Sequence, residues 1–282
     1  MIKVIKSGFY STIQDEGRLG YRNTGVPLCG AMDKSSYHMS NHLLGNSIDD
    51  ATLEITMLGP ELLFDVDTFI VIAGADISPV LNDMPIVNNR IIAVNKGDTL
   101  KFRNLKSGFR AYLAVKGGFK TETKLGSRSS YQTITNQNVI AKGDELLIEE
   151  YKEHATEPSY SKLKTLDFKS KVLEVYEGPE FQFLSELQRE QLFSEDFIIG
   201  QLYSRMAYQV KPLIKNDLPS ILTGPVLPGT VQLTSSGQLI ILMRDCQTTG
   251  GYPRVLQLSE NAINLLSQKK ERDSVRFQLI HY

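Results

Sequence analysis

The sequence predicts a mainly β protein built from barrels or sandwiches, with a few short helices. Short apolar runs rich in β-forming residues recur along the chain, and turn residues bound most of them; they span residues 69–73, 91–94, 112–115, 172–176 and 239–243. A turn pair followed by alternating polar and apolar residues also recurs, at 96–102, 142–148 and 272–277. Many short strands at such spacing are typical of barrels and sandwiches.

A short pattern occurs twice and indicates two related β units. Residues 53–61 and 173–180 each contain a Leu-Glu pair in a strand-like run, then a Gly-Pro turn and a glutamate. Such repetition favours two units over one sheet. Residues 151–170 are rich in Lys, Glu, Ser and Thr and form the predicted linker. The predicted domains are therefore 1–155 and 165–282.

Three short helices are expected between the strands. Asp33 is a suitable N-cap for a helix that runs to Leu44, and Gly45 is a suitable stop. Further helices are predicted at about 180–192 and 259–268. None of the three carries a strong functional pattern by itself.

Composition excludes several classes of protein. The 282 residues carry 31 Lys plus Arg against 32 Asp plus Glu, so no global basic field exists for nucleic acid or an anionic membrane. The two cysteines, Cys29 and Cys246, make no disulfide framework, which favours a reducing compartment. Residues 1–6 alternate as a strand would, unlike a secretion signal, and no apolar run approaches the ~20 residues of a membrane span. We expect a cytoplasmic protein.

A polar, glycine-rich stretch near the N-terminus is the first candidate site. Residues 12–33 interleave carboxylates, amides and two arginines with glycines, and they include Arg22 and Asp33. Functional loops need such fixed donors and tight turns. Taken alone, however, the stretch is more typical of a long surface connection whose charges pair in solvent.

Arg205 and Tyr208 form the second candidate group. Their spacing lets both side chains face one cleft. There the guanidinium could bind a carboxylate, and the phenol could donate a hydrogen bond. In isolation, a solvated arginine and a half-buried tyrosine beside a strand are the favoured interpretation of this pair.

The stretch from Arg244 to Pro253 is the strongest candidate. It follows an apolar strand with a cation, an anion, a thiol, an amide and two hydroxyls, and then Gly250 and Gly251. Two glycines permit a close backbone approach to a ligand, and the proline fixes the exit. The array suits an amide or ureido group, with backbone N–H groups stabilising developing oxyanion charge. A polar hairpin turn is the alternative.

Several common chemistries have no sequence support. No P-loop for ATP is present, and no cofactor motif is recognisable in the chain. His38 and His42 stand four apart without an obvious third ligand, so exposed helix histidines are favoured over a metal site. Cys246 has no sequence-local histidine base, and a buried structural thiol is the better interpretation.

At these clusters the sequence resembles the family called allophanate hydrolase subunit 2, which includes KipA-type proteins, the C subunit of 5-oxoprolinase and the carboxyltransferase part of urea carboxylase. The resemblance covers nearly the whole chain, and the match through Gln247 to Pro253 is specific. It departs from the family at Ala207, where glycine is common, and at Cys246, where arginine is usual. The matching residues are Thr12-Ile-Gln-Asp15, Gly17-Arg18, Gly20-Tyr21, Gly25-Val-Pro27, Gly30-Ala-Met-Asp33, Asn41, Leu43-Leu-Gly-Asn46, Leu53-Glu54, Gly59-Pro60, Ser204-Arg-Met206, Tyr208, Pro228-Gly-Thr230, Gln232, Ser236-Gly-Gln238, Asp245 and Gln247-Thr-Thr-Gly-Gly-Tyr-Pro253.

The resemblance implies two cyclophilin-like β-barrel units with a site in the cleft between them. It also implies a KipI-like B subunit as obligate partner and an A-type subunit, which together with this chain would open 5-oxoproline to L-glutamate at the expense of ATP. One alternative is a biotin-dependent carboxyltransferase subunit that takes carboxybiotin from a partner and carboxylates urea or another small amide. The other is a KipA-like regulator that sequesters a kinase inhibitor. The chain is expected to be inactive without its partners.

Site roles follow from the resemblance and the clusters together. Asp245 is predicted as a catalytic base or orienter, and Arg205 and Tyr208 as ligands of the substrate carboxylate or carbonyl. No metal ligands are predicted. The predicted substrate-binding residues are Gln232, Ser236, Gln247, Thr248, Thr249, Gly250, Gly251, Tyr252, Arg22 and Asp33.

Overall fold

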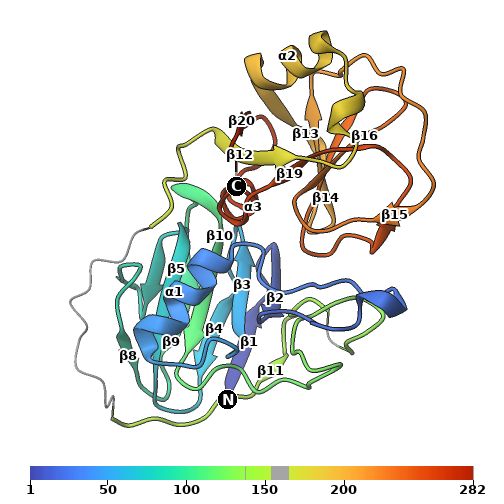
Figure 1. Cartoon of the computed structure of the whole chain (residues 1–282). Helices are drawn as coiled ribbons and strands as arrows, with labels where there is room; N and C mark the ends of the chain where they lie inside the picture. Colours follow the sequence, from blue (N-terminus) through green and yellow to red (C-terminus); the bar gives the residue numbers. More distant parts are fainter. Residues whose placement is uncertain (137, 154–164, 282) are drawn as a thin grey trace. The chain divides into compact units, whose positions relative to one another are not determined.

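The structure is a computed structural model that describes residues 1–136, 138–153 and 165–281. The chain divides into two compact units (Figure 1), an N-terminal unit of Met1–Arg18 with Cys29–Leu166 and a C-terminal unit of Leu19–Leu28 with Asp167–Tyr282. Residues 19–28 thus belong to the C-terminal unit, an exchange that the two contiguous predicted domains did not include. Much of the predicted linker, residues 154–164, lies outside the described residues.

The N-terminal unit consists of two antiparallel sheets around one apolar core. The larger sheet has the order β11-β1-β4-β9-β6-β7, from strands Glu145–Leu146, Ile2–Lys6, Glu61–Phe64, Thr99–Phe102, Pro79–Leu81 and Met84–Pro85. The other has the order β2-β3-β10-β5-β8, from Tyr10–Gln14, Thr52–Thr56, Ser107–Val115, Thr68–Asp76 and Ile92–Val94. Buried side chains of both sheets, such as Phe64 and Leu113, pack in one cluster.

Helix α1, Lys34–Leu44, lies along β5 and β10 (Figure 1). The Asp33 side chain accepts a hydrogen bond from the Ser36 amide, and Gly45 ends the helix in the left-handed conformation. A side-chain acceptor at the N-cap satisfies an amide that the helix leaves unpaired, and glycine takes positive φ without steric cost. The predicted helix is therefore confirmed at both ends.

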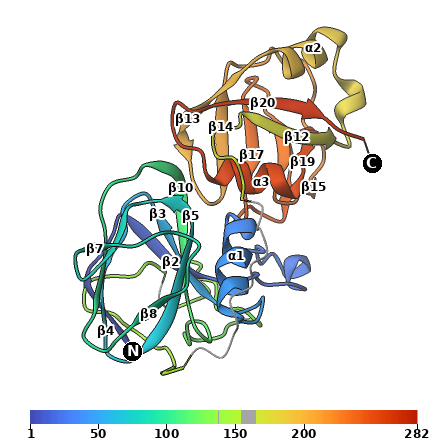
Figure 2. The same ribbon diagram turned by 90° about the vertical axis from the view of Figure 1, so that its left-hand side faces the viewer.

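The C-terminal unit is a closed barrel with the order β12-β19-β16-β17-β14-β13-β20 (Figure 2). A closed sheet leaves no edge strand unpaired, and the mainly β class predicted from the sequence is confirmed. A two-stranded sheet of β15 (Gly224–Pro225) and β18 (Thr249–Gly250) accompanies the barrel. The barrel strands are Val172–Glu177, Arg254–Leu258, Thr230–Leu233, Leu239–Leu242, Ala207–Lys211, Phe197–Tyr203 and Ser274–Leu279.

The helices of the C-terminal unit differ in how well they were predicted. Helix α3, Glu260–Ser267, begins after its N-cap Ser259 as expected. The helix predicted at 180–192 is instead a 3₁₀ turn at Phe181–Phe183 followed by α2 at Glu186–Ser194. Ser185 and Gln188 form a reciprocal capping box that starts α2 at its own boundary. In the part of the chain that the structure describes, no helix is both long and apolar enough to span a membrane.

Candidate functional site

The loop after β17 begins with residues that tie it to the rest of the C-terminal unit. Arg244 is 2% exposed. Its guanidinium donates to Glu260 Oε2 at 3.2 Å and to Asn264 Oδ1 at 3.0 Å, both on α3. Since hydrogen bonds between ionised groups are the stronger ones, this contact fixes the loop to the helix.

Asp245, the next residue, is held by a buried ion pair. Arg205 Nε donates to Asp245 Oδ2 and Arg205 Nη2 donates to Asp245 Oδ1, each at 2.8 Å, and the Asp245 amide donates to the Arg205 carbonyl at 2.9 Å. This bidentate geometry is the most specific that a guanidinium and a carboxylate can form. Two of the three residues predicted for catalysis, Arg205 and Asp245, are therefore engaged with each other, which favours the orienting role of Asp245 over that of a base.

Cys246 is a buried thiol, as the sequence predicted. It has no exposed surface, and burial raises its pKa to about 11 against the opposing effect of the neighbouring Arg22 guanidinium. Arg22 lies in the 3₁₀ turn η1, Arg22–Thr24, and also donates from Nη2 to the Val226 carbonyl. A thiol that stays protonated at neutral pH is a poor nucleophile.

After the buried residues 244–246, the loop reaches the surface. Gln247 and Thr248 are half-buried, Thr249 is exposed, and Tyr252 is 39% exposed. Backbone contacts hold this part in place: the Thr248 carbonyl accepts from Val226 N at 3.1 Å and the Gly251 carbonyl from Ile221 N at 3.0 Å. The accessible loop, residues 247–252, is thus a fixed polar surface.

Gln232 of β16 lies buried beneath the accessible loop and contacts its backbone. Its side chain is 2% exposed, and Nε2 donates to the Tyr252 carbonyl at 3.5 Å. A Cβ at Gly250 would lie 2.4 Å from that Nε2, so a larger residue there would displace the Gln232 amide from its present position. The structure therefore brings Gln232 together with Gln247, Thr248, Thr249, Gly250, Gly251 and Tyr252.

Three other predicted site residues have different surroundings. Tyr208 has no exposed surface, and its hydroxyl donates to the Lys269 carbonyl at 3.3 Å inside the barrel, a placement that does not support direct contact with a ligand. Ser236 is exposed in the β16–β17 turn, where its hydroxyl hydrogen-bonds Thr234 at 2.9 Å. Asp33 belongs to the N-terminal unit and caps α1. For these residues a role in ligand binding stays a prediction.

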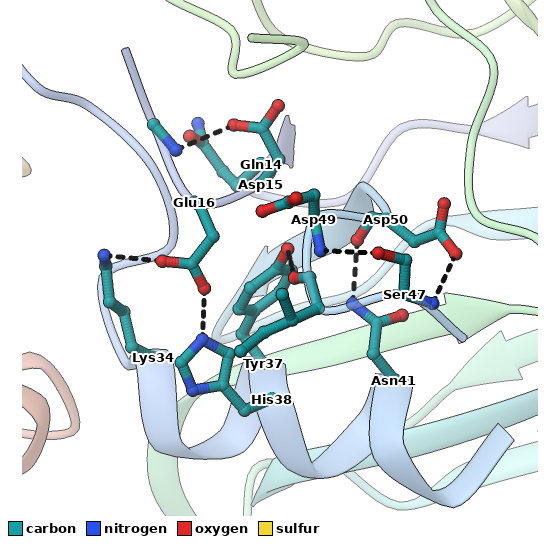
Figure 3. A network of polar contacts seen from close by, with 12 residues as sticks. Gln14, Asp15, Glu16, Lys34, Tyr37, His38, Asn41, Ser47, Asp49 and Asp50 are labelled. Atoms are coloured by element: carbon teal, nitrogen blue, oxygen red, sulfur yellow. Dashed lines mark hydrogen bonds and ion pairs between the residues drawn. The ribbon is translucent and has the colours of Figure 1, made fainter. Parts of the chain in front are cut away.

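The N-terminal unit has a polar cluster that sequence reasoning only partly found. Figure 3 shows Glu16 between two side chains of α1: Oε2 accepts from Lys34 Nζ at 2.8 Å and Oε1 pairs with His38 Nε2. Burial acts to raise the Glu16 pKa, but the hydrogen bonds and charges of His38 and Lys34 prevail and lower it to about 2. His38 is thus paired with a carboxylate; among the described residues, no group of three potential metal ligands occurs.

Asp15 organises a loop from a distant part of the sequence. Its Oδ1 accepts from the hydroxyls of Ser127 and Ser129, each at 2.6 Å, and its Oδ2 accepts from the Arg128 amide at 2.6 Å. Arg18 Nη2 donates to the Ser129 carbonyl in the same loop. Residues 127–129 were not predicted to be near Asp15, because more than a hundred residues separate the two and no local pattern joins them.

Comparisons with known proteins agree with this fold along nearly the whole chain. The family described as "Carboxyltransferase domain, subdomain A and B" matches residues 24–279. The C subunit of 5-oxoprolinase from Escherichia coli (strain K12) is 30% identical over 274 residues, which cover 95% of this chain and 87% of that protein. The urea amidolyase of Lachancea kluyveri is 30% identical over 309 residues, which cover 99% of this chain but 17% of that protein.

Two solved structures show the same fold. The K. lactis urea amidolyase superposes with a TM-score of 0.89 at 26% identity, over 99% of this chain and 19% of that one. TTHA0988 superposes with a TM-score of 0.87 at 25% identity, over 98% of this chain and 56% of that one. The relatives are subunits or domains of hydrolase- and carboxylase-type enzymes. This chain belongs to the family of the carboxyltransferase domain, subdomain A and B, and is homologous to the C subunit of 5-oxoprolinase and to the matching region of urea amidolyase.

Proposed function

We propose that this chain is the C-type subunit of an ATP-dependent, cytoplasmic 5-oxoprolinase complex that opens the cyclic amide of 5-oxoproline to give L-glutamate. The observation that carries the proposal is the 30% identity to the Escherichia coli 5-oxoprolinase chain over 95% of this chain and 87% of that protein. A fixed, polar and accessible loop in the C-terminal unit supports it.

The proposed reaction adds water across the amide C–N bond of the ring, which leaves a carboxylate and a free amine. Negative charge develops on the carbonyl oxygen as water attacks, and donors held in advance stabilise it best. Gln247 and the backbone of residues 248–251 would supply such donors, because Gln232 and the contacts to Val226 and Ile221 fix the loop. Asp245 and Arg205 would act as the anchor of this loop.

The proposal also includes partners. A KipI-like B subunit and an A-type subunit would complete the active complex and bind ATP, since this chain has no P-loop. The test is to purify the chain with both partners, supply 5-oxoproline and ATP, and measure glutamate. ATP-dependent glutamate release that stops when this chain is omitted is the expected result; no release from the complete, folded set would overturn the proposal.

A carboxyltransferase is the second candidate, and the family match itself favours it. The family is described as a carboxyltransferase domain, and the K. lactis urea amidolyase superposes with a TM-score of 0.89. In that case the same loop would hold urea or another small amide, and the carboxyl donor would be carboxybiotin on a partner. Transfer of a labelled carboxyl group from carboxylated biotin carrier protein to urea or another small amide would support this candidate, and absence of transfer to any of them would exclude it.

A further inference from the structure

Arg18, the last residue of the segment Met1–Arg18 of the N-terminal unit, has an unusual environment. Its side chain is 0% exposed, and Nη2 donates to the Ser129 carbonyl. Among the described residues, the buried Nε and Nη1 have no hydrogen-bond partner. No carboxylate oxygen of the described residues lies within 4.0 Å of the Arg18 guanidinium, the distance limit for an ion pair.

The nearby carboxylate of Asp15 is committed elsewhere. Its Oδ1 accepts from Ser127, Ser129 and the Gly17 amide, and its Oδ2 accepts from the Arg128 amide at 2.6 Å. Asp15 thus holds the loop that faces Arg18 without pairing with the guanidinium. Hydrogen bonds to Asp15 hold this loop, while Nε and Nη1 of Arg18 keep unused donors.

Comparison with the other buried arginines shows that Arg18 is the exception. Four arginines in the described part of the chain are buried, and the other three have a carboxylate partner: Arg110 with Glu54, Arg205 with Asp245 and Arg244 with Glu260. A buried charge is costly unless it is paired, and a guanidinium cannot lose its proton to escape that cost. An anion from outside the chain would supply what Arg18 lacks.

We propose that Arg18 is the anchor of a binding site for a small carboxylate-type anion. A planar carboxylate matches the geometry of a guanidinium better than any other common anionic group of metabolites except phosphate. The ligand is small, because Arg18 has no exposed surface of its own. An uncharged amide such as urea would not neutralise the guanidinium.

Two sources could provide this anion. One is the carboxylate of 5-oxoproline itself, an assignment that rests on the proposed function. The other is bicarbonate, a small inorganic anion with the same planar arrangement of oxygens. Both place two oxygens in one plane, so the experiment must compare them directly.

The first experiment is isothermal titration calorimetry of the full chain, alone and with its partner subunits, at constant ionic strength. The probes are 5-oxoproline, bicarbonate, urea and 2-pyrrolidone, which has the same ring as 5-oxoproline without the carboxylate. We expect 5-oxoproline or bicarbonate to bind, according to the source, and the two uncharged probes not to bind. If neither anion binds, the proposal is wrong.

Variants identify the residue. Arg18→Gln keeps a donor for the Ser129 carbonyl but removes the charge, and it should weaken anion binding by about tenfold or more, while Arg18→Lys should weaken it less. Arg128→Gln is the matched control, since this half-buried arginine of the same loop donates to the Thr121 carbonyl, and it should keep the affinity. A folded Arg18→Gln variant that binds as tightly as the wild type would overturn the proposal.

A measurement on the wild-type chain needs no variant to fold. The Arg18 Nε–H signal in a nitrogen–proton NMR spectrum should shift as the anion is added and saturate with the calorimetric Kd; an unmoved signal contradicts the site. The two proposals can fail separately. Glutamate release by the complex without anion binding at Arg18 would overturn this inference alone, and anion binding without glutamate release would overturn the proposed function alone.

Discussion

Arg205 in the C-terminal unit and Arg18 in the N-terminal unit are 7% and 0% exposed, yet their surroundings differ in kind. Arg205 donates to both carboxylate oxygens of Asp245 at 2.8 Å each, so its charge fixes the loop that begins at Asp245. Arg18 has one carbonyl as its hydrogen-bond acceptor among the described residues. A paired arginine is part of the scaffold, whereas a buried and uncompensated one has capacity left for a ligand.

The largest expected effect separates these two arginines by stability. Arg205→Met should lower the free energy of unfolding by about 3–5 kcal/mol, because Asp245 is left buried without its cation. Arg18→Met should change it by less than about 1 kcal/mol in either direction, because the loss of one hydrogen bond is offset by removal of an unpaired buried charge. Urea denaturation of each variant, followed by circular dichroism, measures both.

A double variant checks the cause. Adding Asp245→Leu to Arg205→Met removes the stranded carboxylate and should recover most of the lost stability. Equal losses of stability in Arg205→Met and Arg18→Met would show that the distinction between a scaffold arginine and a ligand-binding arginine is wrong.

The Glu16 cluster sharpens the comparison with a carboxylate that is only partly buried and pairs with both Lys34 and His38. Its pKa is lowered to about 2 from 4.5, so its stabilising effect is complete above pH 4.5 and is lost as the pH falls toward 2. Above pH 4.5 the wild type should be more stable than Glu16→Gln by about 2 kcal/mol, after allowance for solvent screening, and this difference should shrink with acid.

Urea denaturation at pH 6 and pH 3 measures that difference. Asp49→Asn, which alters an exposed carboxylate of the same unit, is the control for the loss of one negative charge. A difference in unfolding free energy between the wild type and Glu16→Gln that stays constant across this range would contradict a stabilising role for the Glu16 ion pair.

Local signals predicted the elements well. Asp33 and Gly45 fix α1 because the contacts that start and end a helix lie within three or four residues. The helix predicted from residue 180 failed for an equally local reason: Leu184 is extended and Ser185 caps a new helix. The class of the fold follows from such strand and turn patterns, whereas the exchange of residues 19–28 to the C-terminal unit has no local signal.

The candidate site was predicted as residue types, but its pairings were not. Gln232 and the loop at 247–252 were both expected, and the structure places them in contact. Arg205 and Asp245 were given separate roles, since forty residues divide them and the sequence does not show that their charges meet. The contact of Asp15 with Ser127 is likewise a product of the fold.

The Gln247→Ala variant tests whether the accessible loop contributes to activity, and its expected effect is smaller than that of changing the buried Arg205–Asp245 pair. Gln247→Ala should lower kcat/KM for glutamate release by the complex about tenfold, because one donor to the developing oxyanion is lost. Its stability should change by no more than about 0.5 kcal/mol, since the side chain is only half-buried. Gln201→Ala, an exposed glutamine of β13, is the control; equal activity of both variants would remove Gln247 from the site.

Cys246 gives the smallest expected effect, and it tests whether chemistry in the loop needs the thiol. Because burial raises its pKa to about 11, only ~0.1% of the thiol is ionised at pH 8, and it has no exposed surface. We expect no reaction with a disulfide reagent in the native chain, where Cys29 is also buried, and two reactive thiols after unfolding in guanidinium. Cys246→Ala should keep glutamate release within about twofold. Rapid labelling of the native chain with loss of activity would instead make the thiol a participant, and Arg22, whose guanidinium acts to lower the pKa of Cys246, would then be the cation that activates it.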